Sequence, residues 1–274
     1  MTLTHRHLTR LAVGFAAFGS LTACGGISQQ QEIDLGAQQA QQVDAQLPML
    51  RDATVDAYVN SLGRSIASRT SRADLTWHFA VVNTDVINAF ALPGGYVYVN
   101  RGVLERAANE SEAASVLAHE IEHVVRRHSV KQMEQMQNAN IGVALACTLT
   151  NVCQNQAAQA VVQVGGTALF AKFSRADEVQ ADEGGFNNMI AAGIDPHGML
   201  TFFEKLLADE QSGSSNVSSW FSDHPGTQDR IADIQRLLSE NASRLHGLRT
   251  DSQAFQSMKR RLNQLPAAPR TASQ

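Results

Sequence analysis

Residues 119–123 read H-E-x-x-H and lie inside a segment, Glu112–Lys131, whose apolar residues recur at helical spacing. Because each helical residue turns the chain by about 100°, positions four apart share one face of a helix. His119 and His123 can therefore offer imidazoles to a single ion, with Glu120 at the edge of the same cluster. The motif predicts two zinc ligands and a general base for water. A pattern this short also occurs by chance, so a third ligand has to support it.

Two segments offer a third ligand. His128 lies beyond His123 at about 140° around a continued helix, so we expect it to point away, as a surface or capping histidine. Glu178 and Asp182 are separated by one helical turn on the next predicted helix and share a face. Glu178 would complete a His/His/Glu zinc set, and Asp182 would accept a hydrogen bond from a zinc-bound histidine. The alternative is a solvated acidic helix face.

The apolar periodicity predicts an α+β, helix-rich fold with a small, mainly antiparallel sheet. A strand is expected at residues 75–83, and a strand, a Pro-Gly-Gly turn and a second strand at residues 88–100. Helices are expected before residue 48 and at residues 52–69, 102–108, 112–131, 176–192, 196–209 and 226–243. An extended substrate could add to an edge strand at Ala89, Phe90, Ala91 and Leu92. The alternative is an ordinary hairpin.

The first residues have the pattern of an export signal. Arg6 and Arg10 precede an apolar run, Leu11–Ala23, that is too short to span a bilayer. Residues 21–24, L-T-A-C, resemble a bacterial lipobox, which implies a lipid on Cys24 and cleavage before it. By resemblance to enterobacterial sorting, two glycines and no Asp after the cysteine favour the outer membrane. The alternative is a plain secretory signal.

Composition limits the classes of partner. The 274 residues carry a formal net charge of -4 and no basic stripe, so we expect no nucleic-acid partner. An exported chain permits a disulfide between Cys147 and Cys153, although two buried free thiols are the alternative. We divide the chain into a signal peptide (1–23), a lipidated tether or first helix (24–50), a main domain (51–250) and a partly disordered tail (251–274).

Three motifs in order resemble metallopeptidase family forty-eight, which includes HtpX and the CAAX prenyl endopeptidase. They are H-E-x-x-H, then S-R-x-x-E-x-x-A-D at residues 174–182, then D-H-P at residues 223–225 with Arg230. Residues 88–95 are also similar to the segment before the metal helix in these enzymes, and the resemblance covers about residues 52–238. One departure is Glu122, where relatives often have a small residue.

The resemblance implies a gluzincin of the exported lipoprotein branch: a periplasmic zinc metalloendopeptidase anchored to the outer membrane. His119, His123 and Glu178 would hold one Zn²⁺, and Glu120 would be the general base. His224 would stabilise the oxyanion or, alternatively, bind zinc in a resting state. The expected substrates are unfolded or misfolded envelope proteins, as in protein quality control. The alternative function is chaperone-like assembly of outer-membrane proteins, with latent or secondary proteolysis and contact with the assembly machinery.

Overall fold

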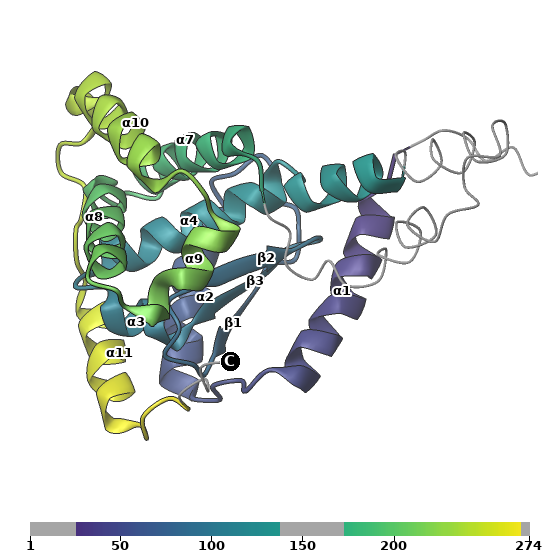
Figure 1. Ribbon diagram of the computed structural model, residues 1–274, viewed down its shortest axis with the longest axis horizontal. Coiled ribbons are helices and arrows are strands. Elements are labelled where there is room, and N and C mark those ends of the chain that lie inside the picture. Colours follow the sequence, from purple (N-terminus) through teal and green to yellow (C-terminus); the bar gives the residue numbers. More distant parts are fainter. Residues whose placement is uncertain (1–25, 138–172, 270–274) are drawn as a thin grey trace, which may run out of the picture.

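Helices cover both faces of a three-stranded sheet in the computed structural model, which describes residues 26–137 and 173–269 (Figure 1). The strands are β1 (His78–Val82), β2 (Ala89–Leu92) and β3 (Tyr96–Asn100). β2 and β3 form the expected antiparallel hairpin, and both Gly94 and Gly95 in its turn have positive φ. β3 lies between β1 and β2 in the sheet and pairs with β1 in parallel. The α+β, helix-rich class is confirmed, but the sheet is mixed rather than mainly antiparallel.

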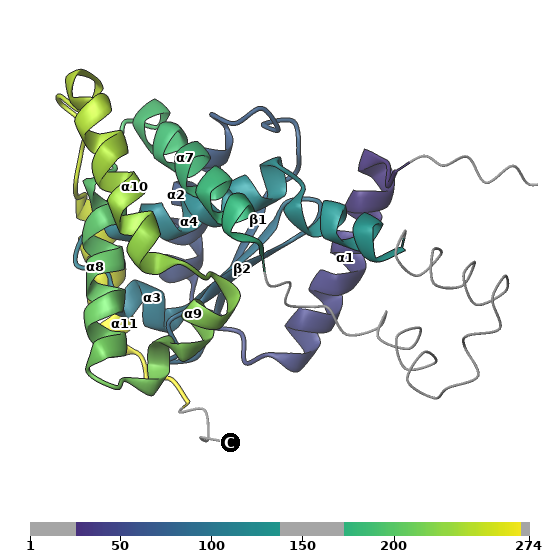
Figure 2. The same cartoon turned by 45° about the horizontal axis from the view of Figure 1, so that its top comes forward.

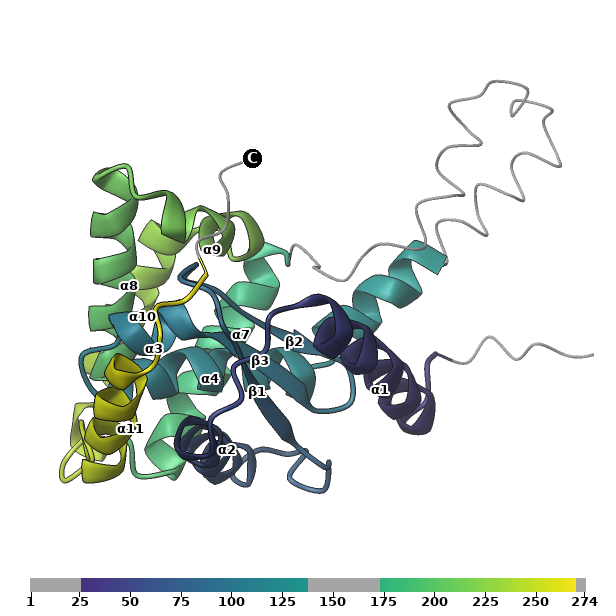
Figure 3. The ribbon, with the colours of Figure 1, turned by 90° about the horizontal axis from the view of Figure 1, so that it is seen from below.

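Each face of the sheet has its own apolar core because side chains alternate along the strands. One face packs against α2 (Ala53–Ala67) and α4 (Glu110–Val125) in the main core. The other packs against α1 (Gln29–Gln46), on the opposite side of the sheet (Figure 3). A Cβ on Gly36 would lie 1.9 Å from the carbonyl oxygen of Pro93, so the glycine permits this close approach. α1 is therefore a packed layer of the fold.

Further helices belong to the described part of the chain. They are α3 (Arg101–Arg106), α7 (Arg175–Ala191), α8 (His197–Gln211), α9 (Ser218–Asp223), α10 (Thr227–Glu240) and α11 (Gln253–Gln264), with 3-10 turns at Ser215–Val217 and Ala242–Arg244. α7 and α8 pack directly on α4, and α10 packs across α7 and α8 (Figure 2). The periodicity correctly predicted α2, α3, α7, α8 and α10.

α11 extends the main core beyond residue 250, where the sequence analysis placed the start of a tail. The side chain of Ser252, just before α11, accepts a hydrogen bond from the backbone N–H of Phe255 and so caps the helix. Phe255, Met258 and Leu262 recur at helical spacing and are fully buried against α2 and α3. The packed domain therefore includes α11.

The helix that carries H-E-x-x-H ends earlier than its periodicity suggests. α4 stops at Val125, and a two-residue turn follows in which Arg127 has φ of 57°, the left-handed region. A second helical segment then covers residues 128–137. The expected single helix to Lys131 is therefore wrong, and the turn redirects every side chain after it.

Several predictions concern residues outside the described ranges. Cys24 and the signal segment precede residue 26, and Cys147 and Cys153 lie between residues 137 and 173. Lipidation and the disulfide therefore stay predictions. Across the two described ranges, every helix is too short or too polar to cross a membrane.

Candidate metal centre

α4 presents two histidines to one point. The side chain of Asn109 caps the helix by accepting a hydrogen bond from the backbone N–H of Glu112. His119 and His123 are each 1% exposed, and their Nε2 atoms lie 3.0 Å apart. Two ring nitrogens so close together face a common point, as two ligands of one ion would.

α7 brings a carboxylate to the same point. A capping box between Ser174 and Asp177 fixes the start of this helix at Arg175, three residues before Glu178. Glu178 is fully buried, with Oε2 3.4 Å from Nε2 of His119 and Oε1 3.5 Å from Nε2 of His123. The residue that the sequence selected as third ligand thus lies beside the two histidines.

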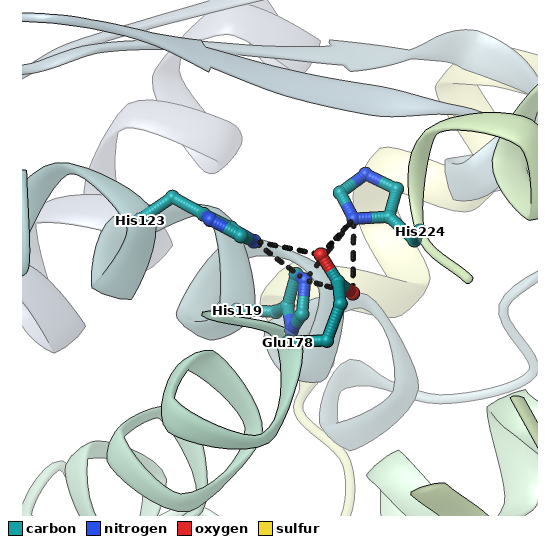
Figure 4. A group of neighbouring side chains, drawn as sticks. All are labelled: His119, His123, Glu178 and His224. Atoms are coloured by element: carbon teal, nitrogen blue, oxygen red, sulfur yellow. Dashed lines mark hydrogen bonds and ion pairs between the residues drawn. The ribbon is translucent and has the colours of Figure 1, made fainter. Parts of the chain in front are cut away.

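His224, directly after α9, completes the cluster. Its Nδ1 lies 3.3 Å from each carboxylate oxygen of Glu178 and 3.3 Å from Nε2 of His119. One ligand atom from each of the four residues lies within 4.8 Å of the others (Figure 4). This buried group of three histidines and one glutamate could hold a metal ion.

Two glycines allow α7 to approach α4 closely. A Cβ on Gly185 would lie 3.2 Å from the backbone of α4, and one on Gly184 would lie 2.1 Å from Oε2 of Glu122. Glu122 accepts hydrogen bonds from Asn188 at 2.6 Å and from Arg126 at 3.0 Å. The additional carboxylate in the motif therefore joins α4 to α7 and does not enter the cluster.

Asp182 supports the first histidine from behind. Its Oδ1 lies 2.8 Å from Nδ1 of His119, on the side of the ring away from the cluster. Arg230 from α10 donates to both carboxylate oxygens and also lies 2.7 Å from Oε2 of Glu178. The sequence analysis quoted Arg230 in a motif but assigned it no contact. A lone arginine on a mostly polar helix gives no sign of burial.

The charges around the cluster favour the protonation states that His123 and Glu178 need as metal ligands. Burial and Arg230 oppose a charge on His119, but Glu178 and Asp182 outweigh them and raise its pKa to about 9. Burial and the charge on His119 lower the pKa of His123 well below its ordinary value. Burial opposes a charge on Glu178, yet nearby positive groups hold its pKa below the ordinary value. His123 is therefore neutral and Glu178 ionised, as metal ligands must be.

Glu120 has the position of a general base. It is fully buried, and neither carboxylate oxygen has a hydrogen-bond partner among the described residues. Its Oε1 lies 3.5 Å from Nε2 of His224, and burial raises the pKa of the carboxyl. A buried carboxylate without hydrogen bonds is unfavourable unless a polar group or an ion meets it. The site thus fits a bound cation with a water beside Glu120.

His128 is not the surface histidine that the sequence analysis expected. It is 2% exposed, and its Nδ1 lies 2.9 Å from Nδ1 of His123. The prediction failed because it assumed that α4 continued unbroken, whereas the turn at Arg127 brings the ring back behind the second histidine. Phe173 stacks on the face of the His123 ring, with ring centroids 3.9 Å apart.

A narrow cleft opens in front of Glu120 and His224. All four residues of β2 line it, as do Gln39 of α1 and Met133 and Met136 of the second helical segment. Among the residues that the structure describes, β2 pairs only with β3 and so is an edge strand of the sheet. The predicted substrate strand therefore lies at an edge and beside the cluster.

A comparison with protein-family models identifies the group to which the site belongs. The model described as Peptidase family M48 matches residues 53–238, which contain all four residues of the cluster. This chain belongs to peptidase family M48. The resemblance drawn from three short motifs is confirmed.

Curated relatives of this M48 chain carry peptidase names. The beta-barrel assembly-enhancing protease of Escherichia coli is 35% identical over 217 residues, which are 77% of this chain and 44% of that protein. The mitochondrial metalloendopeptidase OMA1 of Schizosaccharomyces pombe is 33% identical over 72% of this chain and 56% of its own length. The metalloprotease LoiP of Escherichia coli is 27% identical, with 66% and 68% covered. The chain thus spans less than half of the first relative.

Proposed function

We propose that this M48 chain is a zinc metalloendopeptidase that cleaves unfolded or misfolded proteins of the bacterial envelope. The observation that carries the proposal is the unbonded carboxylate of Glu120 between the buried donor cluster and the cleft. Two imidazoles and a carboxylate are a donor set typical of catalytic zinc sites. His119, His123 and Glu178 would hold the ion. A zinc ion held there would act as a Lewis acid and would lower the pKa of a bound water to roughly 7.

The protein's own groups would carry the proton and orient the ligands. Glu120 accepts a proton from the attacking water at a carboxylate oxygen and donates it to the leaving amine. Asp182 accepts the Nδ1–H of His119 and so directs Nε2 of that ring to the cation. An extended substrate would add to the free edge of β2, which holds its backbone and leaves the side-chain sequence little constrained.

His224 has two possible roles. Because its Nδ1 faces the other three donors, the arrangement favours the reading in which it binds the cation in a resting, closed state. Stabilisation of the oxyanion would follow once the loop after α9 moved the ring aside. We therefore favour the role in which His224 is a ligand of the cation in the resting state.

The envelope location rests on the sequence and on the relatives. From the lipobox-like residues up to Cys24 we infer an outer-membrane lipoprotein that faces the periplasm. Two further beta-barrel assembly-enhancing proteases, from Yersinia pestis and, as a putative one, Vibrio cholerae, are 33% and 32% identical to this chain. Their names favour the second candidate function, in which the chain assists outer-membrane protein assembly and proteolysis is secondary.

The test compares Glu120→Gln with Glu122→Gln in the purified protein. Zinc content and cleavage of casein are measured for both variants and for wild type. Glu120→Gln should keep one zinc and lose about 10²- to 10⁴-fold in cleavage rate, the usual contribution of a general base. Glu122→Gln removes a neighbouring charge that bonds to α7, so it should stay active. Casein cleavage by Glu120→Gln at the wild-type rate would exclude this mechanism.

The two candidate functions differ in cells. If proteolysis is the function, Glu120→Gln should fail to replace wild type in removing misfolded envelope proteins. If assembly is the function, the same variant should restore the assembly of outer-membrane proteins in a strain that lacks the chain. Restored assembly with no cleavage would favour the second candidate.

A further inference from the structure

His128 lies directly behind the second histidine of the donor cluster. Its Nδ1 is 2.9 Å from Nδ1 of His123, whose Nε2 faces the cluster on the opposite side of the ring. Nε2 of His128 lies 3.5 Å from Oδ1 of Asp177 and 3.5 Å from Oε1 of Gln180, both on α7. A line of polar groups therefore runs from α7 through two imidazoles to the cluster.

The distances define which nitrogen carries each hydrogen. If Nε2 of His123 offers its lone pair to a cation, the hydrogen of that ring must be on Nδ1. Two nitrogens 2.9 Å apart need one donor and one acceptor, so Nδ1 of His128 accepts and its own hydrogen is on Nε2. That Nε2–H points to the oxygens of Asp177 and Gln180, which can only accept at those atoms. Every group along the line has a partner of the correct kind.

The turn after α4 is what places His128 there. Arg127, with its φ of 57°, donates from Nε to Oε2 of Glu32 at 2.7 Å and from Nη2 to the carbonyl of Ile27. Glu32 is fully buried in α1 and also accepts from Arg72 at 2.6 Å. The strained turn is therefore held by α1, from outside the helix that it ends.

We propose that His128 is a positioning residue that fixes the tautomer and the orientation of His123 for metal binding. His119 has Asp182 for this purpose, and His128 does for His123 what Asp182 does for His119. The role rests on the proposed metal site. It assigns a function to a buried histidine that the donor cluster itself does not use. Groups of this kind typically change metal affinity by about 10- to 100-fold when they are removed.

The test compares two replacements of similar size, His128→Asn and His128→Leu. Asparagine places an oxygen acceptor near the position of Nδ1, whereas leucine fills the space without an acceptor. Zinc affinity is measured by competition with a chromophoric chelator, and the stability of the metal-free protein is measured by urea unfolding. We expect His128→Leu to bind zinc about 10- to 100-fold more weakly and His128→Asn to recover most of this loss. His197→Leu, which changes a half-exposed histidine on α8, should bind as wild type does.

Equal zinc affinities for the asparagine and leucine variants would overturn the proposal, since a purely space-filling role does not depend on an acceptor. If His128→Leu does not fold, the tautomers of the zinc-loaded wild type decide the question. Long-range ¹H–¹⁵N correlation spectra should show the hydrogen of His123 on Nδ1 and that of His128 on Nε2. A hydrogen on Nδ1 of His128 would overturn it. A wild type that binds no zinc would instead refute the proposed function.

Discussion

Arg230 donates two hydrogen bonds to the carboxylate of Asp182, from Nε to Oδ2 at 2.6 Å and from Nη2 to Oδ1 at 2.8 Å. Both side chains are buried, at 2% and 3% exposure. The guanidinium also lies over the ring of Phe203, 4.5 Å from its centroid. α10 thus holds in place the carboxylate that lies behind His119, the first histidine of the candidate metal cluster.

Replacing Arg230 with methionine should destabilise the protein strongly. The change takes the guanidinium away from two buried carboxylates, those of Asp182 and Glu178, and a loss of this kind typically reduces the free energy of unfolding by about 3–5 kcal/mol. Urea unfolding of the metal-free protein measures the loss. Arg236→Met on the same helix breaks surface ion pairs only and should change that free energy far less. Similar losses for the two variants would contradict the assigned role.

The outer edge of β2 can be identified from one hydrogen bond. The backbone N–H of Asn100 donates to the carbonyl of Asn88 at 2.9 Å, so these opposite residues form a hydrogen-bonded pair. Such pairs alternate along an antiparallel ladder. Phe90 therefore bonds to Tyr98, whereas the N–H and C=O of Ala91 point away from β3 to the free edge.

Ala91→Pro should weaken substrate binding without unfolding the protein. The change removes one outward N–H, and proline is tolerated at such positions of edge strands. We expect kcat/KM for casein to fall by about 3- to 10-fold, the effect of one net hydrogen bond. Phe90→Pro removes an inward N–H instead and should lower the thermal midpoint markedly. An unchanged kcat/KM in Ala91→Pro would exclude β2 as the substrate strand.

Zinc should bind more tightly as the pH rises. Burial and Arg230 oppose a charge on His119 in the metal-free protein, but Glu178 and Asp182 outweigh them and raise its pKa to about 9. Below that pH a cation has to displace a proton from His119, so affinity should rise up to about tenfold per pH unit between about pH 6 and pH 9. Competition titrations at several pH values measure this. An affinity independent of pH would show that His119 is neutral before zinc binds.

Local patterns in the sequence predicted the helices and the hairpin because each buries one face at a regular spacing. α4 and α7 carry His119, His123 and Glu178 on such faces, so their meeting could be inferred from spacing and motif order. The pairing of β1 with β3 joins distant strands of the same apolar character. Nothing in either strand distinguishes a parallel neighbour from an antiparallel one.

The errors at the site have a common cause in tertiary contacts. The left-handed turn at Arg127 depends on Glu32, about 95 positions earlier, so the local sequence gave no sign that α4 ends there. His128 was misplaced as a consequence. Arg230 likewise gains its role only when α10 packs on α7, and the sequence analysis gave Asp182 a histidine partner but no arginine. A buried acid that needs a cation was the available signal, and an unassigned arginine in the motif set was its natural partner.

The position of His224 leads to the last prediction, which concerns latency. Its Nδ1 lies 3.3 Å from Glu178 and from His119, about the distance that separates Glu178 from His119 (3.4 Å). The His224 ring packs against Trp220, with ring centroids 4.6 Å apart. A fourth protein donor in this place would occupy the position that water or substrate needs. His224→Phe keeps an aromatic ring but removes both nitrogens.

We therefore expect His224→Phe to bind zinc more weakly than wild type and, once saturated with zinc, to cleave casein faster. Zinc affinity and initial cleavage rates at several zinc concentrations measure the two effects separately. His197→Phe, on the exposed side of α8, serves as the control and should change neither. The opposite result, full zinc affinity with a cleavage rate lowered about 10²- to 10³-fold, is the signature of a lost oxyanion partner. It would assign His224 to the transition state instead of the resting state.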